Sequence, residues 1–339
     1  MTAEPSSRPG LALRRFVLVA VWLPVVVVAA GVVLQLVLLP QVPATIAVHW
    51  NAAGEADGFA PAWTQPLATA VLGLGLPLLI ALTSLPGLRR GDGGPTYRLM
   101  GATAAAVAAL VTVALTWTFA MQAGLDTAAE APTVWAALVA SFVAGAVVGV
   151  AAWFAQPREE ATDAAAAPAT PLALAANERV LWMRTSGMSR GAAITVVAAV
   201  LLVAGSAVVA WVTGAEPLLA WILTGTALLL LVFAATTLAF HVRVDETGLH
   251  VDSVLGLPRL HVPLADIASA ARVDVSPMGE FGGWGLRLGA GRRFGVVLRS
   301  GEAIEVLRRS GTRFAVTVDD AGTGASLLEG LVERAATRS

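Results

Sequence analysis

The chain has no cysteine and no lysine, and only 13% of its residues are charged. The absence of cysteine excludes disulfides, thiolate zinc sites and thiol nucleophiles. All 22 basic residues are arginine, a usage typical of a GC-rich bacterial genome. The formal net charge of −1 gives the chain no general attraction to nucleic acid, so we expect no nucleic-acid partner.

Charge is missing altogether from six stretches, each longer than the roughly 20 apolar residues that a helix needs to cross a bilayer. A hydrophobic fraction of 57% also lies far outside the range of soluble domains. The sequence therefore predicts an α-helical polytopic membrane protein with six transmembrane helices. The charge-free stretches are residues 16–40, 66–88, 99–125, 131–156, 191–215 and 217–240.

Arginine occurs on only one side of these stretches. Ten arginines precede the first stretch or lie between the second and third and between the fourth and fifth, and 12 follow the sixth. The alternate loops carry acids and no arginine. By the positive-inside rule, we expect both termini in the cytoplasm and a multi-pass protein of the bacterial inner or plasma membrane.

The spans and their connections predict five regions. These are a cytoplasmic N-terminus (1–15), transmembrane helices 1 to 4 (16–155) with an outer loop (40–65), a cytoplasmic linker and interfacial segment (156–190), helices 5 and 6 (191–240) and a cytoplasmic β domain (241–339). The first part of the linker lacks an apolar period. Arginines next to Trp182 are typical of a segment lying on the inner membrane surface.

After His241 the long apolar runs give way to short alternating ones separated by turn residues. The predicted strands cover residues 241–245, 249–254, 259–263, 268–275, 283–288, 294–299, 302–308 and 313–318. A closing helix is predicted over 321–337, with Leu327, Leu328 and Leu331 on one face. We expect a small β-barrel or curled sheet capped by this helix.

The same region resembles bacterial pleckstrin-homology-like domains. The likeness is carried by Val-Asp-Glu-Thr-Gly-Leu at 244–249, Val-Pro-Leu-Ala-Asp-Ile at 262–267, Phe-Gly-Gly-Trp-Gly at 281–285 and Leu-Arg-Ser-Gly-Glu at 298–302. It spans residues 241–335 and implies a pleckstrin-like barrel with one C-terminal helix.

The outer loop reads Val-Pro-Ala-Thr-Ile-Ala-Val-His-Trp-Asn-Ala-Ala-Gly-Glu-Ala-Asp-Gly-Phe over residues 42–59. This resembles the motif of the domain of unknown function 1648 family of bacterial membrane proteins over residues 20–70. The matching residues are Pro43, Ile46, His49, Trp50, Gly54 and Asp57, whereas Ala47 replaces a second proline of the family's motif. Some members of that family resemble immunity proteins that protect bacteria from peptide toxins and signal to a cytoplasmic repressor.

Three interpretations of the loop stay open. His49, Glu55 and Asp57 could coordinate a divalent cation, because imidazole and carboxylate are competent ligands. They could instead cap turns, since Asp57-Gly58 is a turn dipeptide and His49 could hydrogen-bond across the loop. The third interpretation is recognition of an extracellular peptide or small ligand. The residues of this candidate surface are Pro43, His49, Trp50, Asn51, Gly54 and Asp57.

Seven arginines between residues 287 and 313 face only two acids, Glu302 and Glu305. Such an arginine strip could contact anionic lipid of the inner leaflet. Outward positions on alternating strands would also explain it without any role in binding. The strip consists of Arg287, Arg292, Arg293, Arg299, Arg308, Arg309 and Arg313.

No recognisable catalytic motif occurs, so we expect neither an enzyme nor a cofactor. Ionisable residues are absent from the six stretches, where Gln35 is the most polar side chain, which argues against proton-coupled transport. We expect a sensor, scaffold or immunity-type protein whose outer loop meets a ligand and whose β domain meets a cytoplasmic protein. The alternative is a small-molecule transporter or channel component in which Gly73, Gly75 and Pro77 break the second helix.

Overall fold

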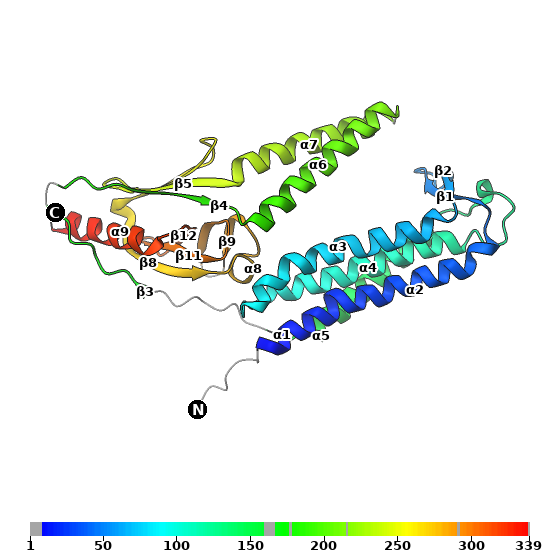
Figure 1. The fold of residues 1–339 in the computed structure, drawn as a ribbon, viewed down its shortest axis with the longest axis horizontal. Coiled ribbons are helices and arrows are strands. Elements are labelled where there is room, and N and C mark those ends of the chain that lie inside the picture. Colours follow the sequence, from blue (N-terminus) through cyan, green and yellow to red (C-terminus); the bar gives the residue numbers. More distant parts are fainter. Residues whose placement is uncertain (1–8, 159–166, 176–177, 215, 290–291, 338–339) are drawn as a thin grey trace. The chain divides into compact units, whose positions relative to one another are not determined.

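The computed structural model describes residues 9–158, 167–175, 178–214, 216–289 and 292–337 (Figure 1). The chain divides into two compact units, Met1–Ala161 and Thr162–Ser339, which are taken in turn. Six helices among the described residues are long and apolar enough to cross a membrane, which confirms the prediction of a multi-pass membrane protein. These spans are Gly10–Gln41, Thr64–Arg89, Pro95–Ala120, Trp135–Ala155, Arg190–Val212 and Pro217–Thr237.

The first unit contains four of the spans. Its first span joins α1 (Pro9–Val17), the π-helical segment η1 (Leu18–Trp22), α2 (Leu23–Leu38) and the 3-10 turn η2 (Leu39–Gln41). The π-helical segment lies just before Pro24, which has no N–H with which to continue the α-helical hydrogen bonds. The other spans are α3 (Thr64–Arg89), α4 (Pro95–Ala120) and α5 (Trp135–Ala155).

Helix α4 packs against α2, α3 and α5 and forms the centre of the first unit. Its alanines bring the backbones close together, as is usual where lipid removes the hydrophobic drive between helices. On α5, a Cβ added to Gly145 or Gly149 would lie 3.0 Å from the side chain of Leu110 or Ala106 of α4. Small residues therefore set the spacing of α4 and α5.

Helix α3 runs without interruption from Thr64 to Arg89 although it contains Pro77. A Cβ added to Gly73 would lie 2.8 Å from Val28 Cγ2 on α2, so this glycine serves the contact between two helices. The break at Gly73, Gly75 and Pro77 that the transporter alternative requires is not present, because α3 stays helical through this segment.

In the second unit, a pair of spans is inserted between two paired strands. Helices α6 (Arg190–Val212) and α7 (Pro217–Thr237) lie between β4 (Trp182–Gly187) and β5 (Ala239–Asp245). The two strands are antiparallel, with Trp182 opposite Val244 and Gly187 opposite Ala239. The β-sheet region therefore begins before these helices as well as following them.

Strand β4 corrects the interpretation of residues 156–190. Trp182 is only 6% exposed and packs in the core of the second unit, close to Gly324. The indole of Trp182 is therefore buried in protein, and it is not the exposed membrane-surface anchor that its neighbouring arginines indicated. Residues 159–166 of the expected linker lie outside the described residues.

The strands of the second unit form two sheets. Their orders are β4-β5-β6-β7 and β3-β8-β11-β12-β10-β9, with β10 and β12 parallel and all other neighbours antiparallel. The remaining elements are β3 (Ala167–Pro168), β6 (Gly248–Ser253), β7 (Arg259–Pro263), η4 (Leu264–Asp266), β8 (Ile267–Val275), α8 (Pro277–Glu280), β9 (Gly285–Gly289), β10 (Arg293–Val297), β11 (Gly301–Arg308), β12 (Arg313–Thr317) and α9 (Ala321–Ala336). The strands and the closing helix predicted after residue 241 are confirmed.

One core joins the two sheets and α9. It includes Phe240 and Val251 from the first sheet, Ile304 and Val316 from the second, and Leu328 from α9. The described strands of the second unit form two separate hydrogen-bonded sheets and no closed barrel. The barrel expectation is wrong because apolar side chains, and not a continuous ladder, hold the sheets together.

Candidate functional site

The conspicuous sequence motif folds as a β-hairpin in the first unit. Strands β1 (Thr45–Trp50) and β2 (Ala56–Pro61) pair antiparallel, with irregular register on both sides of His49. His49 lies opposite Gly58, where an added Cβ would be 2.7 Å from the His49 Cβ. Glycine at position 58 therefore leaves room for the imidazole.

His49 and Asp57 form the polar face of the hairpin. The imidazole Nδ1 lies 2.5 Å from Asp57 Oδ1, and the two side chains are 71% and 44% exposed. This contact across the loop agrees with the turn interpretation. It leaves both groups accessible to a ligand.

Asn51 organises the turn between the strands. Its Oδ1 accepts hydrogen bonds from the backbone N–H groups of Ala53 and Glu55 at 2.9 and 3.1 Å. Gly54 has a φ of +84°, and an added Cβ there would lie 2.7 Å from Trp135 Nε1. An L side chain at position 54 would meet both backbone strain and a clash.

The connection between α4 and α5 fixes the hairpin in place. Gln122 Oε1 accepts from the Ala47 N–H at 2.7 Å, and Gln122 Nε2 donates to the Ala47 carbonyl at 3.0 Å. Trp50 Nε1 donates to the Pro132 carbonyl at 3.1 Å. The hairpin is therefore a fixed surface and not a loose loop.

Comparison with known families singles out this region. Residues 26–74 match the family model described as Domain of unknown function (DUF1648). No curated protein and no solved structure matches the chain. The DUF1648 segment comprises most of α2, the hairpin and the first part of α3, and it contains every residue of the predicted outer motif.

A buried polar cluster joins the DUF1648 segment to α4. Gln35 is fully buried, and its Nε2 donates to the hydroxyls of Thr69 and Thr116 at 2.8 and 3.0 Å. The Thr69 hydroxyl donates back to Gln35 Oε1 at 3.1 Å. Because its amide is satisfied, Gln35 ties α2 to α3 and α4 and is unavailable to a solute.

The structure does not bring His49, Glu55 and Asp57 together as metal ligands. Glu55 Oε2 accepts from Asn51 Nδ2 at 3.3 Å instead of joining His49 and Asp57. Within the described residues, no group of three or more His, Cys, Asp or Glu side chains could hold a metal ion. The hairpin therefore offers one imidazole–carboxylate pair.

The arginine strip lies mostly at the end of its sheet that is remote from α6. Arg293 and Arg313 begin the parallel strands β10 and β12, whereas Leu298, just past the other end of β10, accepts from the Ser189 N–H beside α6. Arg292, Arg308 and Arg309 share the remote end, Arg287 lies midway opposite Gly295, and Arg299 lies near α6. This placement does not favour contact with lipid around α6, and the lipid role stays a prediction.

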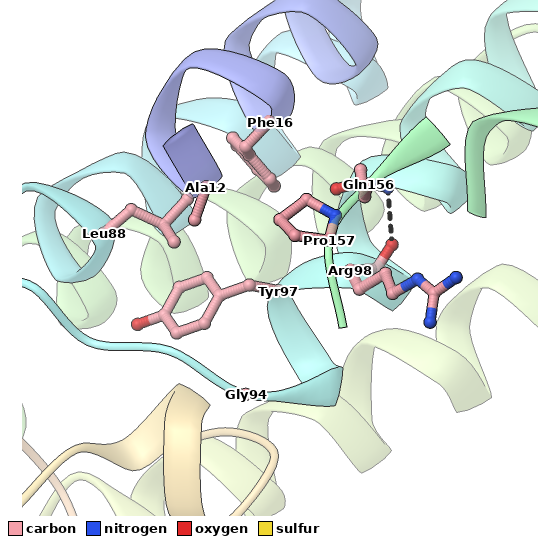
Figure 2. Close-up of a pocket in the computed structure, with 8 residues that line it drawn as sticks. All are labelled: Ala12, Phe16, Leu88, Gly94, Tyr97, Arg98, Gln156 and Pro157. Atoms are coloured by element: carbon pink, nitrogen blue, oxygen red, sulfur yellow. Dashed lines mark hydrogen bonds between the residues drawn. The ribbon is translucent and has the colours of Figure 1, made fainter. Parts of the chain in front are cut away.

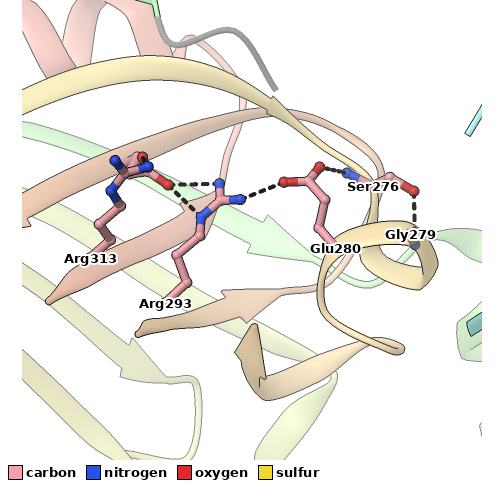
Figure 3. Close-up of polar contacts among 6 residues, drawn as sticks. Ser276, Gly279, Glu280, Arg293 and Arg313 are labelled. Carbon is pink, nitrogen blue, oxygen red and sulfur yellow. Dashed lines mark hydrogen bonds and ion pairs between the residues drawn. The ribbon is translucent and has the colours of Figure 1, made fainter. Parts of the chain in front are cut away.

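Arg293 belongs to a buried ionic network that sequence reasoning missed (Figure 3). Its guanidinium lies 2.6 Å from Glu280 Oε2 and 2.6 Å from Glu305 Oε2, and all three side chains are less than one-tenth exposed. Burial raises the pKa of Glu280, although hydrogen bonds from Ser276 and Arg293 oppose that shift. The network ties α8 to β10 and β11.

A small pocket lies at the opposite end of the first unit from the hairpin, between the first span, α3, α4 and the end of α5 (Figure 2). Arg98 lines it, but its guanidinium points away and its Nε donates to the Trp153 carbonyl at 2.6 Å. The Gln156 amide donates to the Arg98 carbonyl at 3.0 Å. These bonds join the ends of α4 and α5 and leave the pocket largely apolar.

Proposed function

We propose that this protein is a non-enzymatic membrane receptor that binds a peptide or small ligand at the His49 hairpin and a cytoplasmic protein at its β-sheet region. The observation that carries the proposal is the exposed His49–Asp57 pair on a hairpin fixed to the ends of two spans. A fixed surface of this kind binds a ligand without first having to be ordered.

The surroundings of His49 favour binding over catalysis by a side-chain nucleophile. A His–Asp pair supports nucleophilic catalysis only when a nucleophile hydrogen-bonds to the imidazole. In the part of the chain that the structure describes, the hydrogen bond of the His49 ring goes to Asp57, and no hydroxyl makes that second contact.

Charge supports an orientation with the hairpin outside and the β-sheet region inside. In the first unit, Arg14, Arg15 and Arg98 lie near the ends of spans remote from the hairpin. In the second unit, Arg190 begins α6 next to the sheets, and Glu216 lies at the far end of the helical pair. Under the positive-inside rule, this charge distribution supports the hairpin on the outer side and the sheets on the inner side of a bacterial inner or plasma membrane.

The hairpin end suits a cationic, amphipathic ligand. Glu55, Asp57 and Glu130 are exposed there, and residues 41–88 contain no arginine. Phe59 and Trp63 add exposed aromatic surface at 48% and 63%. A peptide with basic and apolar side chains complements both features.

The proposed binding of a cytoplasmic protein by the β-sheet region rests on its resemblance to pleckstrin-homology-like domains. Two stacked sheets with a C-terminal helix are compatible with that architecture, although the ladder is not closed. The exposed members of the arginine strip at the remote end of the sheet, Arg292, Arg309 and Arg313, carry the charge that would bind an acidic segment of a cytoplasmic protein.

The outer half can be tested with the full chain in lipid nanodiscs. We expect a fluorescent lysine-rich amphipathic peptide to bind and a glutamate-rich peptide of equal length not to bind. Replacing His49→Gln together with Asp57→Asn should weaken binding about tenfold, which corresponds to about 1.4 kcal/mol.

The matched control is Glu216→Gln, which removes an acid from the other unit on the same proposed side and should leave the affinity unchanged. Equal affinity of the hairpin variant and the unmodified protein would refute the proposal. Protein-dependent accumulation of a solute in vesicles would instead favour the small-molecule transporter or channel.

A further inference from the structure

We infer that the turn between β6 and β7, residues 254–258, inserts into the lipid bilayer beside the α6–α7 helical pair. Three of its five residues have large apolar side chains, and Val254, Leu255 and Leu257 are 51%, 63% and 70% exposed. Single exposed apolar residues are common on proteins. Three in one short turn form a patch that calls for a partner.

The position of the turn identifies that partner. Strand β5 follows α7 with only Leu238 between Thr237 and Ala239, and β6 runs antiparallel to β5, back towards α7. The Val254 N–H donates to the Ala239 carbonyl at 3.2 Å. The turn therefore lies close to the junction between α7 and β5 (Figure 1).

The end of α7 is itself suited to lipid. The helix is long and apolar enough to span a membrane, and Val232 and Phe233 near its end are 61% and 54% exposed. The apolar turn thus continues an apolar surface that the bilayer already covers, and a bilayer is the occupant that this continuity indicates.

The two ends of β6 provide an internal comparison. The β5–β6 turn, at the end away from α7, consists of Asp245, Glu246, Thr247 and Gly248 and carries no large apolar side chain. The β6–β7 turn, at the end next to α7, carries three. Only the turn that the helix brings near the membrane is apolar.

The turn also satisfies part of its own backbone, which lowers the cost of placing it among lipids. The Gly256 N–H donates to the Ser253 carbonyl at 2.7 Å, and the Ser253 N–H donates to the Pro258 carbonyl at 3.0 Å. Arg259 is exposed just behind the tip, with its guanidinium beside Gly256. An arginine there can reach headgroup phosphates while the leucines enter the acyl region.

The absence of cysteine makes a direct test simple. Leu255→Cys is introduced into the full chain, labelled with a polarity-sensitive nitrobenzoxadiazole fluorophore, and reconstituted in vesicles of phosphatidylcholine and phosphatidylglycerol. Some of the lipids carry a nitroxide on the acyl chain near the headgroup. Glu246→Cys, in the polar turn at the other end of β6, is the matched control, and Val254→Cys is a second reporter of the same turn.

We expect blue-shifted emission and several-fold stronger nitroxide quenching for the probes at residues 254 and 255 than for the probe at residue 246. Equal quenching at the two ends of β6 would overturn the inference. Blue-shifted emission at residue 255 without nitroxide quenching would overturn it as well, because that result would place the turn against protein, such as a second copy of this chain.

Discussion

The side-chain amide of Gln122 hydrogen-bonds to both the N–H and the carbonyl of Ala47, as the backbone of a neighbouring strand would. Gln122 is 0% exposed and Ala47 is 1% exposed, so both bonds are shielded from water. His49 lies two residues further along β1. The end of α4 thereby holds the hairpin that carries the candidate site.

Replacing Gln122→Leu should lower the free energy of unfolding by about 1–3 kcal/mol for each backbone group of Ala47 left buried without a partner. Denaturant unfolding of the full chain in detergent micelles measures the loss. Gln41→Leu changes an exposed glutamine near the same hairpin and should have little effect. An equal loss in both variants would show that the two bonds to Ala47 are not important for stability.

The contact between Gln122 and Ala47 is of a kind that the sequence alone does not predict. Hydropathy and local alternation predicted the spans, the strands after residue 241 and α9, because these signals depend on neighbouring residues. The partner of Gln122 lies 75 positions away, and a lone glutamine after an apolar helix gives no sign of it. Strand β4 was missed for a related reason: two helices separate it from β5, so no hairpin signal exists.

In the candidate site, too, the local contacts could be predicted from the sequence and the long-range contacts could not. The turn dipeptide Asp57-Gly58 and the position of His49 suggested a contact across the loop, and the structure has one. Trp135 and Pro132 were not predicted, because their contacts with the hairpin depend on how α5 packs in the first unit.

Thr112 offers a second stability test within the bundle. Its hydroxyl is buried and has no hydrogen-bond partner among the described residues, whereas the Thr69 hydroxyl is bonded to Gln35. Thr112→Val should therefore raise the free energy of unfolding by about 1 kcal/mol, because valine has a shape similar to threonine and lacks the unpaired hydroxyl. Thr69→Val should lower it by a comparable amount. The idea fails if the two valine variants change stability in the same direction.

Arg293 should contribute far more to the free energy of unfolding than Arg313 on β12. Its side chain is 8% exposed between two buried glutamates, whereas Arg313 is 51% exposed and 3.6 Å from Glu305. Arg293→Met leaves two carboxylates buried without their cation and should cost about 3–5 kcal/mol of folding free energy. The control Arg313→Met removes a surface partner and should cost less than about 1 kcal/mol. Denaturant unfolding of the full chain measures both costs, and similar costs for both variants would contradict the buried network.

His250 should make the stability of the second unit depend on pH near neutrality. Its ring stacks on His261 with centroids 4.1 Å apart, and the Thr247 hydroxyl lies 2.7 Å from its Nε2. Burial lowers the pKa of His250 below its ordinary value of 6.5, and repulsion from His261 and Arg243 adds to the effect, while Asp245 and Asp252 oppose it. As pH falls below about 6.5, the unfolded chain takes up the proton before the folded one, so stability falls until folded His250 is protonated too.

His250→Phe keeps the stacked geometry and removes the titrating group, so it should reduce the loss of stability between about pH 7.5 and pH 5.5. Urea midpoints of the full chain in detergent, followed by circular dichroism, measure that loss. His241→Gln, which changes an exposed histidine of the adjacent strand, is the control and should leave the pH dependence unchanged. Asp245 does not contribute to this loss. Burial raises the pKa of its carboxyl, but hydrogen bonds from Thr247 lower it, and the pKa lies below the ordinary 3.8, outside this pH window. If His250→Phe and the unmodified chain lose stability equally on acidification, the stacked pair is not the source of the pH dependence.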